Sequence, residues 1–269
     1  MKAKTLALCA GGIALAQLTY TANAWATWSI VAVDPVTREV GVAGASCTEH
    51  SEVIASLVPG KGSLVAQGAT NLAARDKAHD ALAAGGTPSA VIALITRPED
   101  DPDTLTGGLH YQQYAVVALN MDMPATFTGT STFSWTGVMT APHVSVQGNT
   151  LRGPEVVKNA LEAFNNPPDT DTPQLAGRLM AALEAGARAG GDRRCAAELG
   201  ALSVFIKVAR PEDTEDRLTL DLVERSDKFY KPGLLRLFWQ LWVRPETAEG
   251  RVNPLPNLRI AYERWHKAQ

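Results

Sequence analysis

The stretch TWSIVAVDPVTREVGVAGAS, residues 27–46, predicts a β-hairpin at the start of the folded region. TWSIVAV alternates bulky and small residues and is rich in β-branched side chains, as strands are. VGVAGAS has the pattern of a second strand with small side chains. The DPVTRE segment between them favours a turn because Asp34 and Pro35 open it. We therefore expect a hairpin whose first strand starts at Thr27.

The remaining elements come in separate blocks and not as a regular strand–helix repeat. Strand-like patterns occupy residues 54–68, 113–120, 125–129, 143–149, 201–209 and 217–224. Apolar residues at helical spacing occupy residues 69–86, 87–97, 153–164 and 172–191. Separate blocks of this kind predict an α+β fold in which helices are layered on antiparallel sheet.

The C-terminal part differs from the rest of the chain. The segment GLLRLFWQLW, residues 233–242, places its large apolar side chains on one helical face. We therefore expect a main domain at residues 27–227 and a small helical appendage at residues 228–269. A helix that docks on its own domain is the common role for such a face, and a homodimer contact is another.

Residues 1–26 have the features of an export signal. Two lysines precede the apolar run LALCAGGIALAQL, and small residues precede the cut. Cleavage after Ala24 would release a chain starting at Trp25, whereas cleavage after Ala26 would release one starting at Thr27. The run is too short for a good membrane span, so we expect a secreted or periplasmic protein without stable membrane insertion. A retained N-terminal anchor is the alternative.

Composition and motifs exclude several classes of function. The chain of 269 residues carries 25 Lys and Arg against 28 Asp and Glu, and this mildly acidic balance argues against nucleic acid as a partner. It has no phosphate-binding glycine loop and no G-x-S-x-G motif. The five scattered histidines form no metal signature: His50, His79, His110, His143 and His266. We expect neither a metal nor a cofactor.

Two cysteines follow the expected signal, Cys47 and Cys195. An exported protein meets oxidising conditions, so a disulfide between them is the default expectation. The alternative is that Cys47 is a catalytic thiol with His50 as its base.

Thr27 gains a special chemistry if the signal is cut after Ala26. A threonine at position one carries its own base, because its free α-amine lies within reach of its hydroxyl. Such an amine has a pKa near 8, so a useful fraction is neutral at pH 7. The alternative is that Thr27 is only the first residue of a strand.

Several blocks together resemble the family catalogued as domain of unknown function 1028. The hairpin sequence is followed in the same order by LVAQGATN, VQGNTLRGPEVV, and AGGDRRC with SVFIKVARP, so the resemblance runs from Thr27 to Val223. It implies a four-layer αββα sandwich of the N-terminal-nucleophile (Ntn) hydrolase type. It also favours Thr27 as the nucleophile, although the family's substrate is not implied.

Attack of a threonine on an amide carbonyl creates an oxyanion that needs preset hydrogen-bond donors. The backbone N–H groups of Gly68 and Ala69, where a strand gives way to a helix, are candidates. The side chain of Asn149, at the end of another strand, is a third.

Other polar residues are candidates for supporting roles. Ser46 ends the second strand of the hairpin, which would put it beside Thr27, where it could relay a proton or orient the amine. Asp192 and Arg193, in GGDRRC, could polarise the site or bind a charged end of the substrate. Their alternative role is a structural ion pair at a turn.

The sequence thus predicts an exported Ntn-type amidohydrolase that cleaves an amide bond in a peptide or small molecule through Thr27. A catalytically inactive fold that serves as a binding or surface-assembly module is the alternative.

Overall fold

The computed structural model describes residues 27–97, 108–167, 174–197, 199–226 and 251–269. The expected signal peptide and the apolar segment at residues 233–242, with its expected homodimer contact, lie outside these ranges. Within these ranges, no helix has the length and apolar character needed to cross a membrane.

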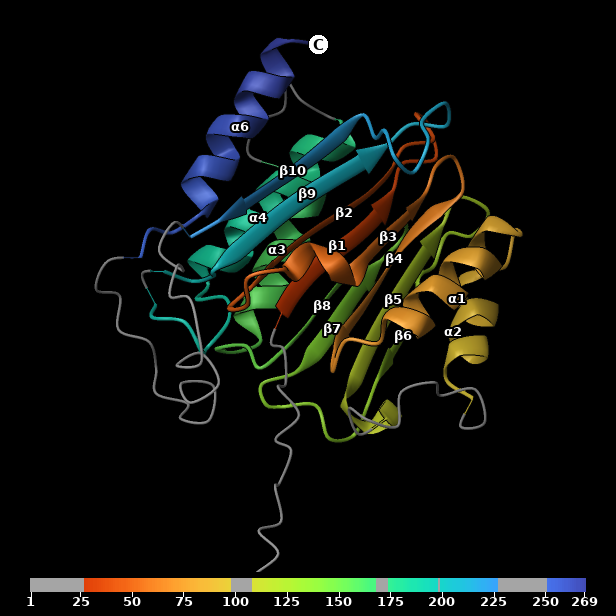
Figure 1. The fold of residues 1–269 in the computed structure, drawn as a ribbon, viewed down its shortest axis with the longest axis horizontal. Helices are drawn as coiled ribbons and strands as arrows, with labels where there is room; N and C mark the ends of the chain where they lie inside the picture. Colours follow the sequence, from red (N-terminus) through yellow and green to blue (C-terminus); the bar gives the residue numbers. More distant parts are fainter. Residues whose placement is uncertain (1–26, 98–107, 168–173, 198, 227–250) are drawn as a thin grey trace, which may run out of the picture.

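The larger sheet has six antiparallel strands in the order β10-β9-β2-β1-β8-β7. Their bounds are β1 Thr27–Val33, β2 Val40–Ser46, β7 Gly137–Ala141, β8 Val144–Asn149, β9 Ser203–Ala209 and β10 Leu220–Arg225. The hairpin β1–β2 lies at its centre, with β8 on the other side of β1 and β9 on the other side of β2 (Figure 1). The predicted hairpin is therefore confirmed, whereas β7 was not predicted.

The smaller sheet has four antiparallel strands in the order β3-β4-β5-β6. Their bounds are β3 Ala55–Val58, β4 Gly62–Gly68, β5 Gln112–Ala118 and β6 Ala125–Thr128. Two short 3-10 helices, η1 Ser51–Ile54 and η3 Gly108–Tyr111, lie next to this sheet in the sequence.

Helices cover the outer face of each sheet, so the described chain has four layers (Figure 1). The helices are α1 Leu72–Ala83, α2 Pro88–Ile95, α3 Glu155–Asn165, α4 Leu175–Arg188 and α6 Leu255–Lys267. α1 and α2 pack on the smaller sheet, and α3 and α4 pack on the larger one. Asn71 and Thr87 cap α1 and α2 through their side chains, which explains where these two helices begin. The mixed α+β expectation is confirmed.

Alternation along β1 divides the core. Trp28 and Ile30 belong to the apolar cluster beneath α3 and α4, whereas Val31 and Val33 belong to the cluster between the two sheets. Because side chains alternate between faces along a strand, Thr27 also faces the other sheet. The side chain of Thr27, at the N-terminal end of β1, therefore points into the space between the two sheets.

α6 is docked on β9 and β10 of the larger sheet. Trp265 Nε1 donates to the carbonyl of Thr219 at 3.0 Å, and the Arg259 guanidinium pairs with Glu184 of α4. The hydrogen bond that Arg259 donates to the Glu184 carboxylate raises the pKa of Arg259, although burial opposes that rise. This part of the expected C-terminal appendage is a helix that packs on the main sheet.

Candidate functional site

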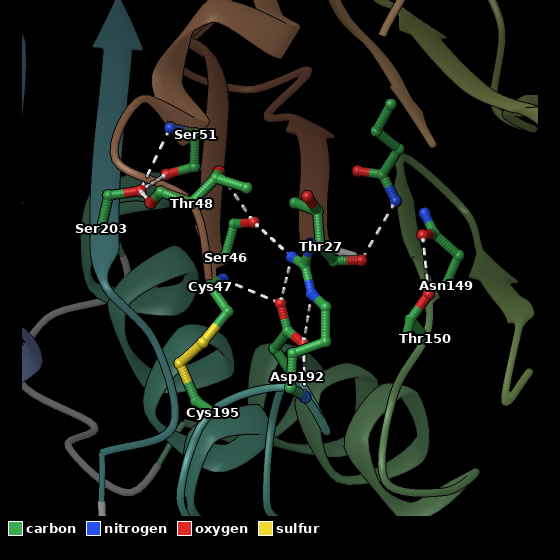
Figure 2. Close-up of polar contacts among 12 residues, drawn as sticks. Thr27, Ser46, Cys47, Thr48, Ser51, Asn149, Thr150, Asp192, Cys195 and Ser203 are labelled. Carbon is green, nitrogen blue, oxygen red and sulfur yellow. Dashed lines mark hydrogen bonds and ion pairs between the residues drawn. A yellow bond between two sulfur atoms is a disulfide. The ribbon is translucent and has the colours of Figure 1, made fainter. Parts of the chain in front are cut away.

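Thr27 stands in a row of polar residues that crosses the larger sheet. The strand register pairs Thr27 with Ser46 on one side and with Asn149 on the other, and it pairs Ser46 with Ser203. All four residues are buried, and Thr27 is 2% exposed. Figure 2 shows Thr27 between Ser46 and Asn149 at the ends of their strands. The structure thus brings together the three residues that sequence analysis assigned to catalysis.

Buried amide side chains lie beneath this row, between the two sheets. Gln67 of β4 donates through Nε2 to the Thr27 carbonyl at 3.4 Å and to Gln113 Oε1 at 2.8 Å. Gln113 Oε1 also accepts from Asn149 Nδ2 at 3.3 Å. Ser29 donates to Gln67 Oε1 at 2.6 Å. A linked network of this kind orients both Thr27 and Asn149, because buried polar groups keep the geometry that satisfies them.

Asp192 lies near the Ser46 end of the row and is linked to Ser46 through Arg194. It is 0% exposed, and its carboxylate accepts from Arg194 Nη2 at 2.7 Å and from Arg194 Nε at 3.1 Å. The backbone N–H groups of Cys47 and Arg194 donate to the same carboxylate at 2.8 and 2.9 Å. A buried carboxylate that accepts four charge-assisted bonds is a rigid support.

The ion pair in GGDRRC is therefore formed by Arg194, not by Arg193 as we expected. Arg193 Nη1 instead donates to the carbonyl of Ser134 at 3.2 Å. Arg194 Nη2 reaches the Ser46 hydroxyl at 3.4 Å, which links Asp192 to the row that contains Thr27. The difference arises because the Arg193 N–H bonds the Thr150 carbonyl, and the next residue turns back to Asp192.

A chain of hydroxyl groups continues from Ser46 away from Thr27. Thr48 donates to Ser46 Oγ at 3.1 Å, and the Thr48 carbonyl accepts from Ser203 Oγ at 2.6 Å. Ser203 Oγ also contacts Ser51 Oγ at 2.7 Å. Arginine can only donate, so the Ser46 oxygen accepts from Arg194 as well as from Thr48. These contacts hold the Ser46 oxygen in place (Figure 2).

Cys47 and Cys195 form the disulfide that the cysteine count predicts, with a Cα–Cα distance of 5.7 Å. The disulfide joins the residue after Ser46 to the residue after Arg194, so it ties together the two segments that meet at this site (Figure 2). Because the Cys47 sulfur is bonded, the structure contradicts the alternative in which Cys47 is a free catalytic thiol.

The expected oxyanion donor at Ala69 is wrong. Its N–H donates to the Tyr111 carbonyl at 2.8 Å, which extends the pairing of β4 with β5 by one residue. Gly68 precedes it with a positive φ of 84°, and a Cβ there would lie 2.4 Å from the Tyr111 carbonyl oxygen. Gly68 thus permits a close strand approach, and Asn149 is the expected donor that the register places beside Thr27.

Two of the surface hollows among the described residues have volumes of about 450 and 490 Å³, and neither of these is lined by a residue of the Thr27 row. Among the residues that the structure describes, no group of three or more His, Cys, Asp or Glu side chains could hold a metal ion.

Comparison with known proteins places this arrangement in a family. One family model, described as "Family of unknown function (DUF1028)", matches residues 27–229. The chain belongs to this family. Its matched region starts at Thr27, the first residue of β1.

A crystal structure of a DUF1028 protein has a similar fold. Protein SPO2555 from Silicibacter pomeroyi aligns with a TM-score of 0.63 and 23% sequence identity, over 89% of this chain and 88% of that chain. At this identity the likeness concerns the fold alone. No curated protein matches the sequence.

Sequence analysis missed Arg194 and the buried glutamines. Side-chain alternation along their strands places Gln67 and Gln113 on the face toward the other sheet. They come within hydrogen-bond distance of each other and of the Thr27 strand only when the two sheets pack together. Arg194 was visible beside Arg193 in GGDRRC. Choosing between two adjacent arginines required the backbone path of the loop.

Proposed function

We propose that this protein is an exported amidohydrolase of the Ntn type, with Thr27 as its nucleophile. The observation that carries the proposal is the strand register that sets Ser46 and Asn149 on either side of Thr27. The four-layer arrangement and the start of the family match at Thr27 support it. Proteolytic removal of residues 1–26 during export is part of the proposal, because only then does Thr27 carry a free α-amine.

In the proposed reaction, Thr27 Oγ1 attacks the carbonyl carbon of an amide while its own α-amine takes the hydroxyl proton. The C–N bond then breaks, and the amine passes the proton to the departing nitrogen. This leaves an ester between Thr27 and the acyl group. Water attacks the ester, with the α-amine again as the base, and releases the acid and the free threonine.

The neighbours of Thr27 supply the supporting groups. Asn149 Nδ2 is the proposed donor to the oxyanion, oriented by its contact with Gln113. Ser46 is the proposed partner of the α-amine, held in place by Arg194 and Thr48. Asp192 is a positioning residue in this scheme, because it acts through Arg194 and through the backbone N–H of Cys47.

The proposal is tested by the intact mass of the exported protein before and after treatment with a β-lactone acylating probe. We expect a chain that begins at Thr27 and gains one adduct. The adduct should disappear in Thr27→Ala and persist in Thr132→Ala, whose hydroxyl donates to the Gly129 carbonyl and contacts no residue of the Thr27 row. A chain that begins at Trp25, or one that begins at Thr27 and stays unmodified, would overturn the proposal.

An inactive fold that serves as a binding or surface-assembly module is the second candidate. One observation favours it: Thr27 is only 2% exposed, which limits access of a substrate to its hydroxyl. Binding of a partner that is unchanged in Thr27→Ala, together with no adduct on Thr27, would favour this function.

A further inference from the structure

A second group of side chains, distant in role from the Thr27 row, is arranged as a nucleophile, a base and an acid. Ser56 Oγ on β3 lies 2.7 Å from His79 Nδ1 on α1. His79 Nε2 lies 2.9 Å from Oε1 of Glu215, in the loop between β9 and β10. All three residues line the hollow of about 450 Å³. We propose that this hollow is a second acyl-transfer site, which hydrolyses small uncharged esters.

The hydrogen bonds determine which nitrogen of His79 is the base. The ionised carboxylate of Glu215 can only accept, so His79 Nε2 carries the proton that they share. In the neutral ring that the proposed reaction requires, His79 Nδ1 then has a lone pair and accepts the hydrogen of Ser56. The two ring nitrogens exchange the roles that they have in the common Ser-His-Asp arrangement, but either nitrogen of a neutral imidazole can be the base.

Three elements of the fold hold Ser56, His79 and Glu215 together, and the Glu215 side chain is open to solvent. The side chain of His79 is 16% exposed and that of Glu215 is 66% exposed. His79 is fixed from three elements, because α1 carries it, β3 presents Ser56 and the β9–β10 loop presents Glu215. Orientation of the base by a third group is the feature that distinguishes an activated serine from an ordinary one.

The edge position of β3 provides a hydrogen-bond donor beside Ser56. The Ala69 N–H donates to the Tyr111 carbonyl on the β5 side of β4. The backbone N–H and C=O groups of the odd-numbered β4 residues therefore point to β5, and those of the even-numbered residues point to β3. Leu64 is therefore the β4 residue that exchanges backbone bonds with Ser56. The N–H of Leu57, the next residue, points to the outer edge of the sheet. A backbone N–H directly after the nucleophile is a usual oxyanion donor.

The lining of the hollow defines the substrate class. Its cations are already neutralised, because Lys207 pairs with Asp221 at 3.0 Å and Arg75 pairs with Asp76 at 2.6 Å. Its apolar surface comes from Ala55, Leu57 and Leu218. A space of this size is at the small end of ligand sites, and nothing in the lining offers an unpaired cation for a carboxylate. A short-chain, uncharged ester fits these properties.

The proposed reaction has two steps, acylation of Ser56 and hydrolysis of the acyl-serine. Ser56 Oγ forms a bond to the ester carbonyl carbon while its proton moves to His79 Nδ1, and the resulting imidazolium is stabilised by Glu215. The bond from the carbonyl carbon to the alcohol oxygen breaks, and His79 gives its proton to that oxygen. Water then attacks the carbonyl carbon of the acyl-serine and loses a proton to His79 Nδ1. The bond from that carbon to Ser56 Oγ breaks, His79 returns the proton to Oγ, and the acid and free Ser56 are released.

The test uses the full chain with 4-nitrophenyl acetate as substrate and a fluorophosphonate as covalent probe. We expect one adduct, which peptide mass mapping places on Ser56. Hydrolysis should fall at least tenfold in Ser56→Ala and in His79→Gln, since general-base catalysis contributes at least about a hundredfold. Ser56→Ala should cause the same fall in hydrolysis when it is made in a Thr27→Ala background, which separates this site from the proposed threonine nucleophile.

Surface variants keep the test decisive if a buried variant does not fold. Glu215→Gln should lower kcat several-fold with KM unchanged, Glu215→Asp should restore part of that loss, and Glu212→Gln in the same exposed loop should have no effect. Labelling at another residue, no labelling of the folded protein, or equal rates for Glu215→Gln and Glu212→Gln would overturn the proposal.

Discussion

Replacing Arg194 by methionine tests whether Asp192 and Arg194 form the rigid support of the Thr27 row. The substitution removes the polar contacts of the Arg194 side chain, among them two to the Asp192 carboxylate and one to Ser46, but keeps a similar aliphatic stem. Asp192 remains 0% exposed with only the N–H groups of Cys47 and Arg194 as described donors. Breaking a buried ion pair by removing one partner costs about 3–5 kcal/mol.

The expected loss lies at the lower end of that range. The Arg194 side chain is 27% exposed, so water can partly replace it, and two backbone donors stay on the carboxylate. We therefore expect Arg194→Met to lower the free energy of unfolding by about 3 kcal/mol. For a domain of this size such a loss lowers Tm by roughly 6–12 °C.

The assay is urea unfolding of the oxidised protein, with the free energy extrapolated to zero denaturant. Arg193→Met is the matched control, because this neighbouring arginine makes one exposed contact to the Ser134 carbonyl and should cost less than about 1 kcal/mol. Equal losses in the two variants, or a loss below about 1 kcal/mol for Arg194→Met, would refute the role assigned to the pair.

Three further predictions concern the disulfide and two residues outside the Thr27 row, Gly191 and Asp213. Reducing the disulfide, which spans 148 residues, should cost up to about 5 kcal/mol in urea unfolding, and an unchanged midpoint would contradict this. Gly191→Ala should cost about 2–4 kcal/mol by the same assay, because Gly191 has a φ of 52° and a Cβ there would lie 2.7 Å from the Trp28 ring. Burial would raise the pKa of Asp213, but hydrogen bonds from the Arg210 and Thr219 N–H groups lower it below its ordinary value. The stability that this carboxylate contributes is therefore present above pH about 4 and is lost as the pH falls further. Below pH about 4 the free energy of unfolding should therefore change less with pH in Asp213→Asn than in the wild type.

The strands of the site could be predicted because their side-chain alternation is local. TWSIVAV, VGVAGAS and HVSVQGN each show a period of two, and each contains a polar residue at the end that reaches the site: Thr27, Ser46 and Asn149. A hairpin pairs neighbouring strands, so the contact between Thr27 and Ser46 followed from the sequence. The position of Asn149 beside Thr27 did not follow from the sequence, because all four strands of the smaller sheet lie between β1 and β8 along the chain.

The errors have the same origin. The prediction that Ala69 offers its N–H at a strand end fails because the carbonyl of Tyr111, the residue before β5, accepts that N–H. Arg193 and Arg194 are chemically equivalent in the sequence, and the backbone path through Asp192 decides which one turns inward. Ser56, His79 and Glu215 lie on three separate elements, so no spacing in the sequence relates them.

The sequence alone therefore determined most of the elements and their order, though not β7, together with the disulfide partners and the residue types available for chemistry, since periodicity, capping and residue counts are properties of neighbouring residues. The tertiary structure decided which strand ends share a row, which arginine pairs with Asp192 and which side chains meet Gln67 and His79. These outcomes depend on contacts between segments far apart in the chain, and such contacts are formed only when both sheets and their covering helices bury a common core.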